Sequence, residues 1–188
     1  MKPASIVVIL MAIILLLSVT SHAQDERPET PYIQYNVCPF ECCQFGTWTA
    51  RSLLKAHKRE DDNTAIAFTI KPGEKFIALE GNVHIVKLGM LILEKTVGNF
   101  IKGDKIYILT YRGEGFYDLW YKGEVLDLEA ENLDKVWANS KIVNYPEFIW
   151  WVLVKNKDGK QGWLRLKNNM SDGGFGTEEQ FDGADKCS

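Results

Sequence analysis

The sequence predicts an all-β fold, and three observations lead to this class. Apolar and polar residues alternate over short stretches, most clearly over 105–111, which is the side-chain period of a strand. Turn residues separate these stretches at intervals of roughly 8–12 residues, a spacing typical of barrels and sandwiches. The stretch from Trp150 to Trp163 has the pattern of a complete hairpin. Asp158 and Gly159 are expected to form its two-residue turn, for which both need positive φ angles.

Short strands are expected along most of the chain. Each is a short apolar or alternating run, and they lie at 45–50, 65–70, 76–79, 83–87, 90–93, 105–111, 116–121, 125–128, 151–155 and 162–166. Turns are expected at 71–74, 80–82, 98–104 and 122–124, because glycine, proline and asparagine gather there. A loop is expected at 112–115.

One segment departs from this pattern. Residues 128–139 contain good helix formers, and Leu133, Val136 and Trp137 fall at the i, i+3 and i+4 positions of one helical face. We therefore expect a short helix near 128–139, inserted before the last hairpin. Pro146 ends the insertion, because proline disfavours helix in the residue that precedes it.

The first 23 residues have the pattern of a secretory signal peptide. Lys2 supplies a positive start, residues 6–17 are apolar, and Ala23 provides a small residue at the expected cleavage site. An uncleaved anchor is the alternative, although the apolar run is short for a membrane span of about 20 residues. We expect an exported protein, periplasmic or extracellular, that is not bound to the membrane after cleavage.

Four cysteines remain after this cleavage: Cys38, Cys42, Cys43 and Cys187. Export and an even count favour disulfides. A direct Cys42–Cys43 bond would strain the peptide that joins the two residues, so two pairings remain. Each of them links the N-terminal cysteine cluster to Cys187. A zinc site is the alternative, but the paired Cys-x-x-Cys spacing of such sites is missing.

Charge and motifs argue against several function classes. The formal net charge is −3 and the chain has no basic block, which disfavours nucleic-acid binding. His57 is expected to be exposed and His84 to face solvent, and neither has a second histidine at metal-binding spacing. Glu147 is the nearest candidate for a catalytic acid, yet a surface position is expected for it. We predict a protein without catalytic residues, metal or cofactor, while an enzyme of an undetected type stays open.

Residues 100–166 resemble the bacterial SH3-like (SH3b-type) family. The resemblance is carried by Lys102-Gly103-Asp104 before a strand, the Trp150-Trp151 pair, the Asp158-Gly159 turn and the Gly162-Trp163 pair. In the first half of the chain, only the turn at 71–74 and the strand rhythm are similar.

Together with a weak internal repeat of turn and strand, this resemblance implies two small SH3-like barrels in tandem, at 37–95 and 96–168. A flexible segment at 24–36 precedes them and a Gly-rich acidic tail at 169–188 follows them. One continuous β domain is the alternative.

Members of this family bind ligands and do not catalyse, and exported members look like modules that recognise the cell wall. By this resemblance Trp150 lies on the ligand face, and Tyr117, Trp120 and Tyr121 belong to a loop that could line the same groove. The alternative, favoured for either tryptophan of the pair taken alone, is that these aromatic residues fill a core. We expect a non-catalytic module that binds a cell-envelope ligand, either a cell-wall glycopeptide or an exported protein. The alternative is an assembly protein that docks on another exported protein through a sheet edge.

Overall fold

The computed structural model describes residues 27–40, 42–113, 116–126, 130–166 and 180–184 of the 188-residue chain. The predicted signal peptide, most of the predicted acidic tail and Cys187 lie outside these ranges. Among the described residues, no helix has both the length and the apolar character needed to cross a membrane.

The predicted all-β class is confirmed. The described ranges contain thirteen strands and one helix, α2 (Ala130–Ala138). The strands are β1 (Tyr32–Gln34), β2 (Gly46–Ala50), β3 (Leu54–His57), β4 (Ile66–Ile70), β5 (Lys75–Lys87), β6 (Gly89–Leu93), β7 (Lys105–Gly113), β8 (Phe116–Tyr121), β9 (Glu124–Val125), β10 (Ser140–Asn144), β11 (Glu147–Lys155), β12 (Gln161–Leu166) and β13 (Phe181–Asp182).

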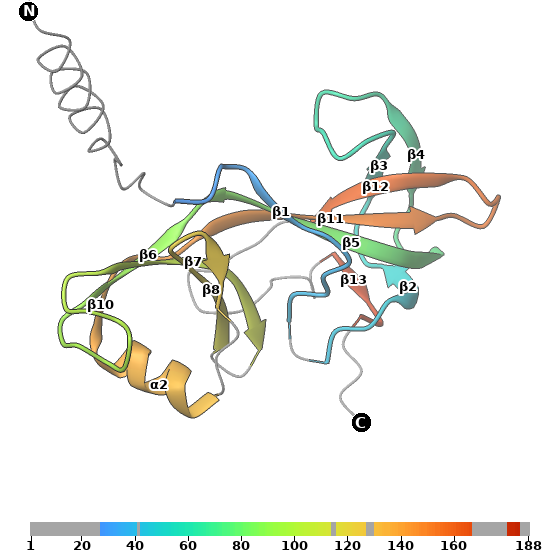
Figure 1. The fold of residues 1–188 in the computed structure, drawn as a ribbon. Coiled ribbons are helices and arrows are strands. Elements are labelled where there is room, and N and C mark those ends of the chain that lie inside the picture. The colour runs from blue at the N-terminus through green and yellow to red at the C-terminus, as the bar shows by residue number, and fades with distance from the viewer. Residues whose placement is uncertain (1–26, 41, 114–115, 127–129, 167–179, 185–188) are drawn as a thin grey trace, which may run out of the picture.

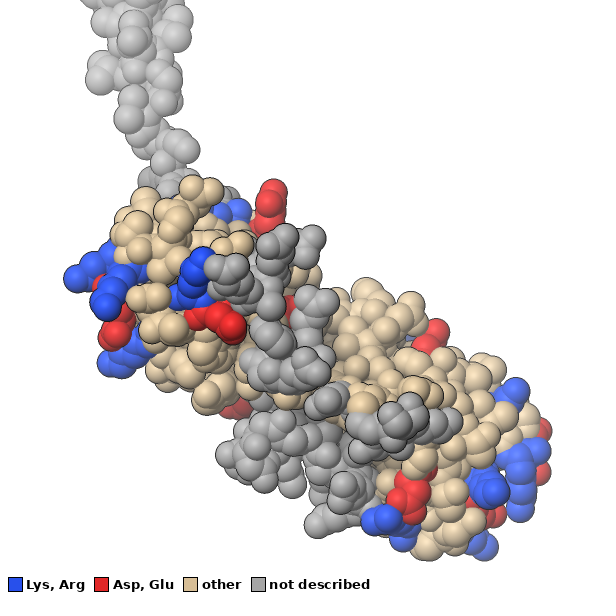
Figure 2. Space-filling model, turned by 90° about the horizontal axis from the view of Figure 1, so that it is seen from below, with Lys and Arg blue, Asp and Glu red and all other residues tan. Residues whose placement is uncertain are grey.

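The strands form two antiparallel sheets (Figure 1). The first has the order β13-β2-β5-β11-β12-β3-β4, with β1 paired to β5, and it curls into a half-barrel. The second has the order β10-β6-β7-β8-β9, and α2 lies beside it. Figure 2 shows acidic and basic side chains intermixed at both ends of the visible face.

The two sheets are nested in the sequence. Strand β5 pairs along most of its length with β11, and the whole second sheet lies between these two strands in the chain. The final hairpin therefore completes the half-barrel that begins with β2, so the sheets do not follow the predicted division at residues 95 and 96.

The turn predicted at 80–82 is wrong, because β5 runs through it without a break. Gly81 sits where the indole of Trp150 crosses the strand. A Cβ atom at this position would lie 2.3 Å from Nε1 of Trp150 and 3.0 Å from the carbonyl oxygen of Val37. The glycine permits this close approach of a ring to the backbone, which is a common reason for glycine inside a strand.

The hairpin of β11 and β12 is confirmed, with Lys155 opposite Gln161 as its last strand pair. Its turn is longer than predicted. The amide of Asn156 donates to the carbonyl of Lys160, which leaves a loop of three residues. Gly159 has a φ of 79°, whereas Asp158 is not among the described residues with positive φ. A single positive-φ glycine is typical of a three-residue hairpin loop.

A two-residue turn does occur between β8 and β9. Lys122 and Gly123 have φ angles of 48° and 92°, and they lie between the paired residues Tyr121 and Glu124. The turn predicted at 122–124 is therefore confirmed.

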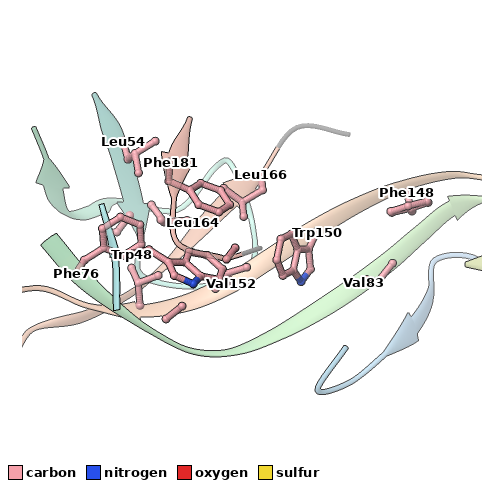
Figure 3. Packing of buried hydrophobic residues seen from close by; sticks show 14 of the residues in the cluster. Trp48, Leu54, Phe76, Val83, Phe148, Trp150, Val152, Leu164, Leu166 and Phe181 are labelled. Carbon is pink, nitrogen blue, oxygen red and sulfur yellow. The ribbon is translucent and has the colours of Figure 1, made fainter. Parts of the chain in front are cut away.

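The described residues form two apolar cores. The first lies within the half-barrel, where Trp48 stacks on Phe181 with ring centres 4.4 Å apart and Phe76 meets Trp48 edge-on (Figure 3). The second lies between the second sheet and α2, and Val136 is fully buried in it. Leu133 and Trp137 pack against this second core, which confirms both the predicted helix and its apolar face.

Candidate functional site

Trp150, predicted on a ligand face, lies in the first core. Its side chain is fully buried, and its indole N–H donates to the carbonyl of Val37 at 3.0 Å. The rings of Phe40 and Trp48 pack against it, with ring centres 5.8 and 6.0 Å away. The indole leaves no surface on which a ligand could rest, so the structure corrects the ligand-face assignment in favour of the core role.

The other three predicted residues, Tyr117, Trp120 and Tyr121, lie on strand β8 and not in a loop. Successive side chains of a strand point to opposite faces. Trp120 accordingly packs toward the first core and meets Tyr32 with ring centres 5.7 Å apart. Tyr117 and Tyr121 pack against the second core. The four predicted ligand residues therefore do not line one groove.

Tyr121 has a structural partner. Its hydroxyl donates to the carboxylate of Asp104, and its ring lies 5.0 Å from that of Phe100. The hydrogen bond from Tyr121 is the main reason that the pKa of Asp104 falls below its usual value, followed by the bond from the amide of Ile101. These contacts fix the turn before β7.

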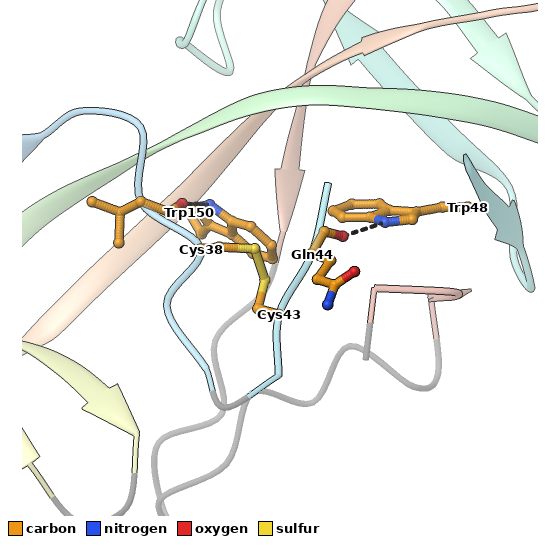
Figure 4. Close-up of a disulfide and its surroundings, with 6 residues drawn as sticks. Cys38, Cys43, Gln44, Trp48 and Trp150 are labelled. Carbon is orange, nitrogen blue, oxygen red and sulfur yellow. Dashed lines mark hydrogen bonds between the residues drawn. A yellow bond between two sulfur atoms is a disulfide. The ribbon is translucent and has the colours of Figure 1, made fainter. Parts of the chain in front are cut away.

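The disulfides match part of the prediction. Cys38 and Cys43 are bonded, with Cα atoms 5.5 Å apart, so the pairing in which Cys38 binds Cys42 is excluded. Cys42 is also disulfide-bonded. Figure 4 shows the Cys38–Cys43 bond beside the indole of Trp150, where both cysteines pack against the first core. The Cys38–Cys43 bond closes a short loop directly after Val37, whose carbonyl accepts the hydrogen bond from Trp150.

A group of four aromatic side chains gathers at the second sheet. We call Tyr111, Tyr117, Trp137 and Tyr145 the aromatic cluster. Tyr117 lies at its centre: it stacks on Trp137 with ring centres 5.2 Å apart and planes 7° from parallel, and it meets Tyr111 edge-on at 5.2 Å. The ring of Tyr145 is 6.3 Å away.

Four separate segments supply these rings. Tyr111 and Tyr117 are cross-strand partners on β7 and β8, Trp137 comes from the last turn of α2, and Tyr145 follows β10. Pro146 is buried directly after Tyr145. Three of the rings are half-buried, while Tyr145 is 48% exposed. The cluster is thus supported by rigid elements and open to solvent on one side.

The surroundings of Tyr117 keep its hydroxyl group neutral. Burial raises the pKa of Tyr117, and the neighbouring phenols of Tyr145 and Tyr111 raise it further. At neutral pH the Tyr117 hydroxyl therefore stays protonated, and a protonated phenol can both donate and accept a hydrogen bond. Stacked aromatic faces and phenol groups together suit a ligand that has apolar faces and hydroxyl or amide groups.

A second polar group lies on the outer face of the half-barrel. Glu60 contacts Nε2 of His84 at 2.5 Å and accepts a hydrogen bond from the amide of Asn82 at 2.8 Å. The His84 side chain is only 15% exposed, so the solvent-facing position expected for it is wrong. A carboxylate beside an imidazole can act in general-base catalysis. Here both oxygens of Glu60 are bound to strand β5, and the contacts hold the loop between β3 and β4 against the sheet.

Glu147 occupies the surface position predicted for it, where it pairs with Lys87 at 2.6 Å. Among the described residues, no three histidine, cysteine or acidic side chains are grouped so that they could hold a metal ion.

Comparison of the chain with protein-family models, with curated proteins and with solved structures gave no match. The SH3-like resemblance stays a prediction.

Sequence reasoning found Tyr117 and missed the other three members of the cluster. Tyr111 had a usable signal, because it and Tyr117 flank the expected loop at 112–115 and a hairpin brings such residues together. Trp137 and Tyr145 had none, since they meet Tyr117 only after the helix and β10 have packed on the second sheet.

Proposed function

We propose that this chain is an exported, non-catalytic binding module that recognises a cell-wall glycopeptide through the aromatic cluster. The observation that carries the proposal is the stack of Trp137 on Tyr117 beside the exposed ring of Tyr145. Aromatic side chains on rigid elements give large contact areas at little cost in conformational entropy. Sugar rings and short peptides present the apolar faces and polar groups that such a surface can contact.

Export is part of the proposal and rests on two features. The N-terminal sequence has the pattern of a signal peptide, and the Cys38–Cys43 disulfide favours an oxidising compartment. Both features support a cell-envelope ligand over a cytoplasmic one.

The test is a binding assay on purified peptidoglycan. Tyr145→Ala removes the most exposed ring of the cluster, and we expect it to weaken binding roughly tenfold, since an interface aromatic contributes about 1–2 kcal/mol. Tyr35→Ala is the matched control, because Tyr35 is 67% exposed and makes no ring contact with the cluster. Equal retention of both variants and the unmodified protein, or no retention of any of them, would show the proposal to be wrong.

The second candidate function is an assembly protein that docks through a sheet edge. Within the described residues, β10 pairs on one side only, with β6, and its Val143 is 46% exposed. An edge strand with an exposed apolar side chain can pair with a strand of another protein. Co-purification of a stoichiometric partner that is lost on Val143→Pro, with peptidoglycan binding absent, would favour this function.

A further inference from the structure

A second surface lies at the far end of the half-barrel from the second sheet. An open depression of about 470 Å³ lies beside the loop between β11 and β12, and its lining includes Thr47, Lys75, Ile77, Lys155 and Lys157. In Figure 1 this loop lies at the right, whereas α2 lies at the lower left. The depression is therefore separate from the aromatic cluster, and a role for it does not depend on the function proposed above.

The strand register explains why these side chains meet. On β5 the exposed residues Lys75, Ile77 and Leu79 alternate with buried ones, so they share the outer face of the sheet. Ile77 lies opposite Thr47 of β2 and Lys155 of β11. Residues opposite each other on paired strands share a face, so Lys155 lies beside Ile77, and Lys75 lies two residues before Ile77 on the same face.

The depression carries excess positive charge. In the described part of the chain, Lys75 and Lys155 make no ion pair, and Lys157 has Glu74 as its partner at 3.4 Å. Glu74 also accepts a hydrogen bond from the amide of Lys71 at 2.8 Å. This backbone bond is the main cause of the lowered pKa of Glu74, and the side chain of Lys157 is the next. Three of the described lining residues are lysines and none is acidic, and such a field attracts an anion.

Exposed apolar side chains beside the lysines favour an anion that also carries apolar groups. Ile77 is 39% exposed and Leu79 is 37% exposed, and both follow Lys75 along the same face. An extended peptide also places every second side chain on one face. Such a peptide could set carboxylates against Lys75 and Lys155 and an apolar side chain against Ile77. A bilayer is a poorer fit, since the lysines line a hollow and a flat membrane contacts protruding groups.

We propose that this depression binds an extended acidic peptide segment of a partner protein, with carboxylates on Lys75 and Lys155 and an apolar residue on Ile77. The probe is a fluorescein-labelled peptide of sequence Glu-Ser-Leu-Ser-Glu-Ser, in which the two Glu side chains and the Leu side chain share one face when the peptide is extended. Fluorescence anisotropy should show saturable binding that weakens as salt is added, because exposed charge pairs are screened.

Variants of the purified protein make this test specific. We expect the double variant Lys75→Glu with Lys155→Glu to weaken peptide binding by about tenfold or more. Lys141→Glu on β10 changes an exposed lysine elsewhere and should leave binding unchanged. Far-UV circular dichroism checks that the double glutamate variant folds. If it does not fold, the double variant Lys75→Gln with Lys155→Gln, which removes both charges without reversing them, takes its place. A peptide with Lys in place of Glu should not bind.

Three results would overturn the proposal: no binding of the acidic peptide, equal binding by the double variant, or binding of phosphatidylglycerol vesicles without binding of the peptide. Tyr145→Ala separates the two proposals, because it should leave peptide binding unchanged even where it abolishes retention on peptidoglycan. Loss of peptide binding in that variant would assign the peptide to the aromatic cluster and would likewise overturn the role of the depression.

Discussion

Replacement of Trp150 by phenylalanine should destabilise the protein by about 3 kcal/mol. The indole N–H bond to the carbonyl of Val37 contributes about 1 kcal/mol. Phenylalanine is also about three heavy atoms smaller, and the loss of this fully buried volume costs about 2 kcal/mol. The two losses add because neither the hydrogen bond nor the ring packing can be recovered by the smaller side chain.

The matched control is Trp163→Phe. Trp163 lies on the same hairpin but is only half-buried, and it belongs to the outer face of the sheet. We expect this change to cost less than about 1 kcal/mol, as is usual for a site outside a core.

Urea unfolding of each purified variant, followed by far-UV circular dichroism with the disulfides intact, gives the two free-energy differences from the shifts in midpoint. Equal costs for Trp150→Phe and Trp163→Phe would refute the reasoning. So would a loss of peptidoglycan binding by Trp150→Phe without any loss of stability, because it would return Trp150 to the ligand face.

Three further outcomes are expected. Gly81→Ala should lower the free energy of unfolding by about 2 kcal/mol, since its Cβ would overlap the buried indole; an unchanged urea midpoint would contradict this. Proteolysis without reduction, followed by mass spectrometry, should recover Cys42 linked to Cys187, because the other two cysteines bond to each other; a free thiol at Cys42 would contradict it. Asp104→Asn should lower stability at neutral pH by less than about 1 kcal/mol. The pKa of Asp104 in the folded protein lies below its ordinary 3.8. The contribution of Asp104 to stability is therefore present above pH 3.8 and disappears as the pH falls through the folded-state pKa. A stability difference between Asp104→Asn and the unmodified protein that persists at the lowest pH would contradict this role of the Asp104 carboxylate.

The local elements were predictable because their signals are local. The period-two pattern gave the strand at 105–111 and both strands of the last hairpin, and the spacing of Leu133, Val136 and Trp137 gave the helix. A strand or helix that buries one face shows this as a regular spacing of apolar residues in its own sequence. No knowledge of the rest of the fold is needed to recognise such a spacing.

Gly81 illustrates what local signals could not decide. The stretch Glu80-Gly81-Asn82 has the composition of a turn, yet it lies within a 13-residue strand. The reason is the contact of Gly81 with Trp150, a residue far along the chain. The same limit applies to Trp150 itself: its pattern identified the strand, while its burial depends on the loop that carries Val37.

The candidate site was predictable only in part. An aromatic surface was expected, and Tyr117 belongs to one. Period-two alternation along β8 could have separated Tyr117 and Tyr121 from Trp120, since neighbours on a strand cannot share a face. The contributions of Trp137 and Tyr145 required knowledge of how α2 and β10 pack, which the sequence pattern does not contain.

The pairing of β5 with β11 has a consequence for biosynthesis. During translation, the central strand of the half-barrel emerges long before its principal neighbour, because every residue of the second sheet must be made in between. Contacts of such high sequence separation form late and slowly. The core of the half-barrel therefore cannot close until β11 has been made, and before that point the buried face of β5 lacks its principal neighbour.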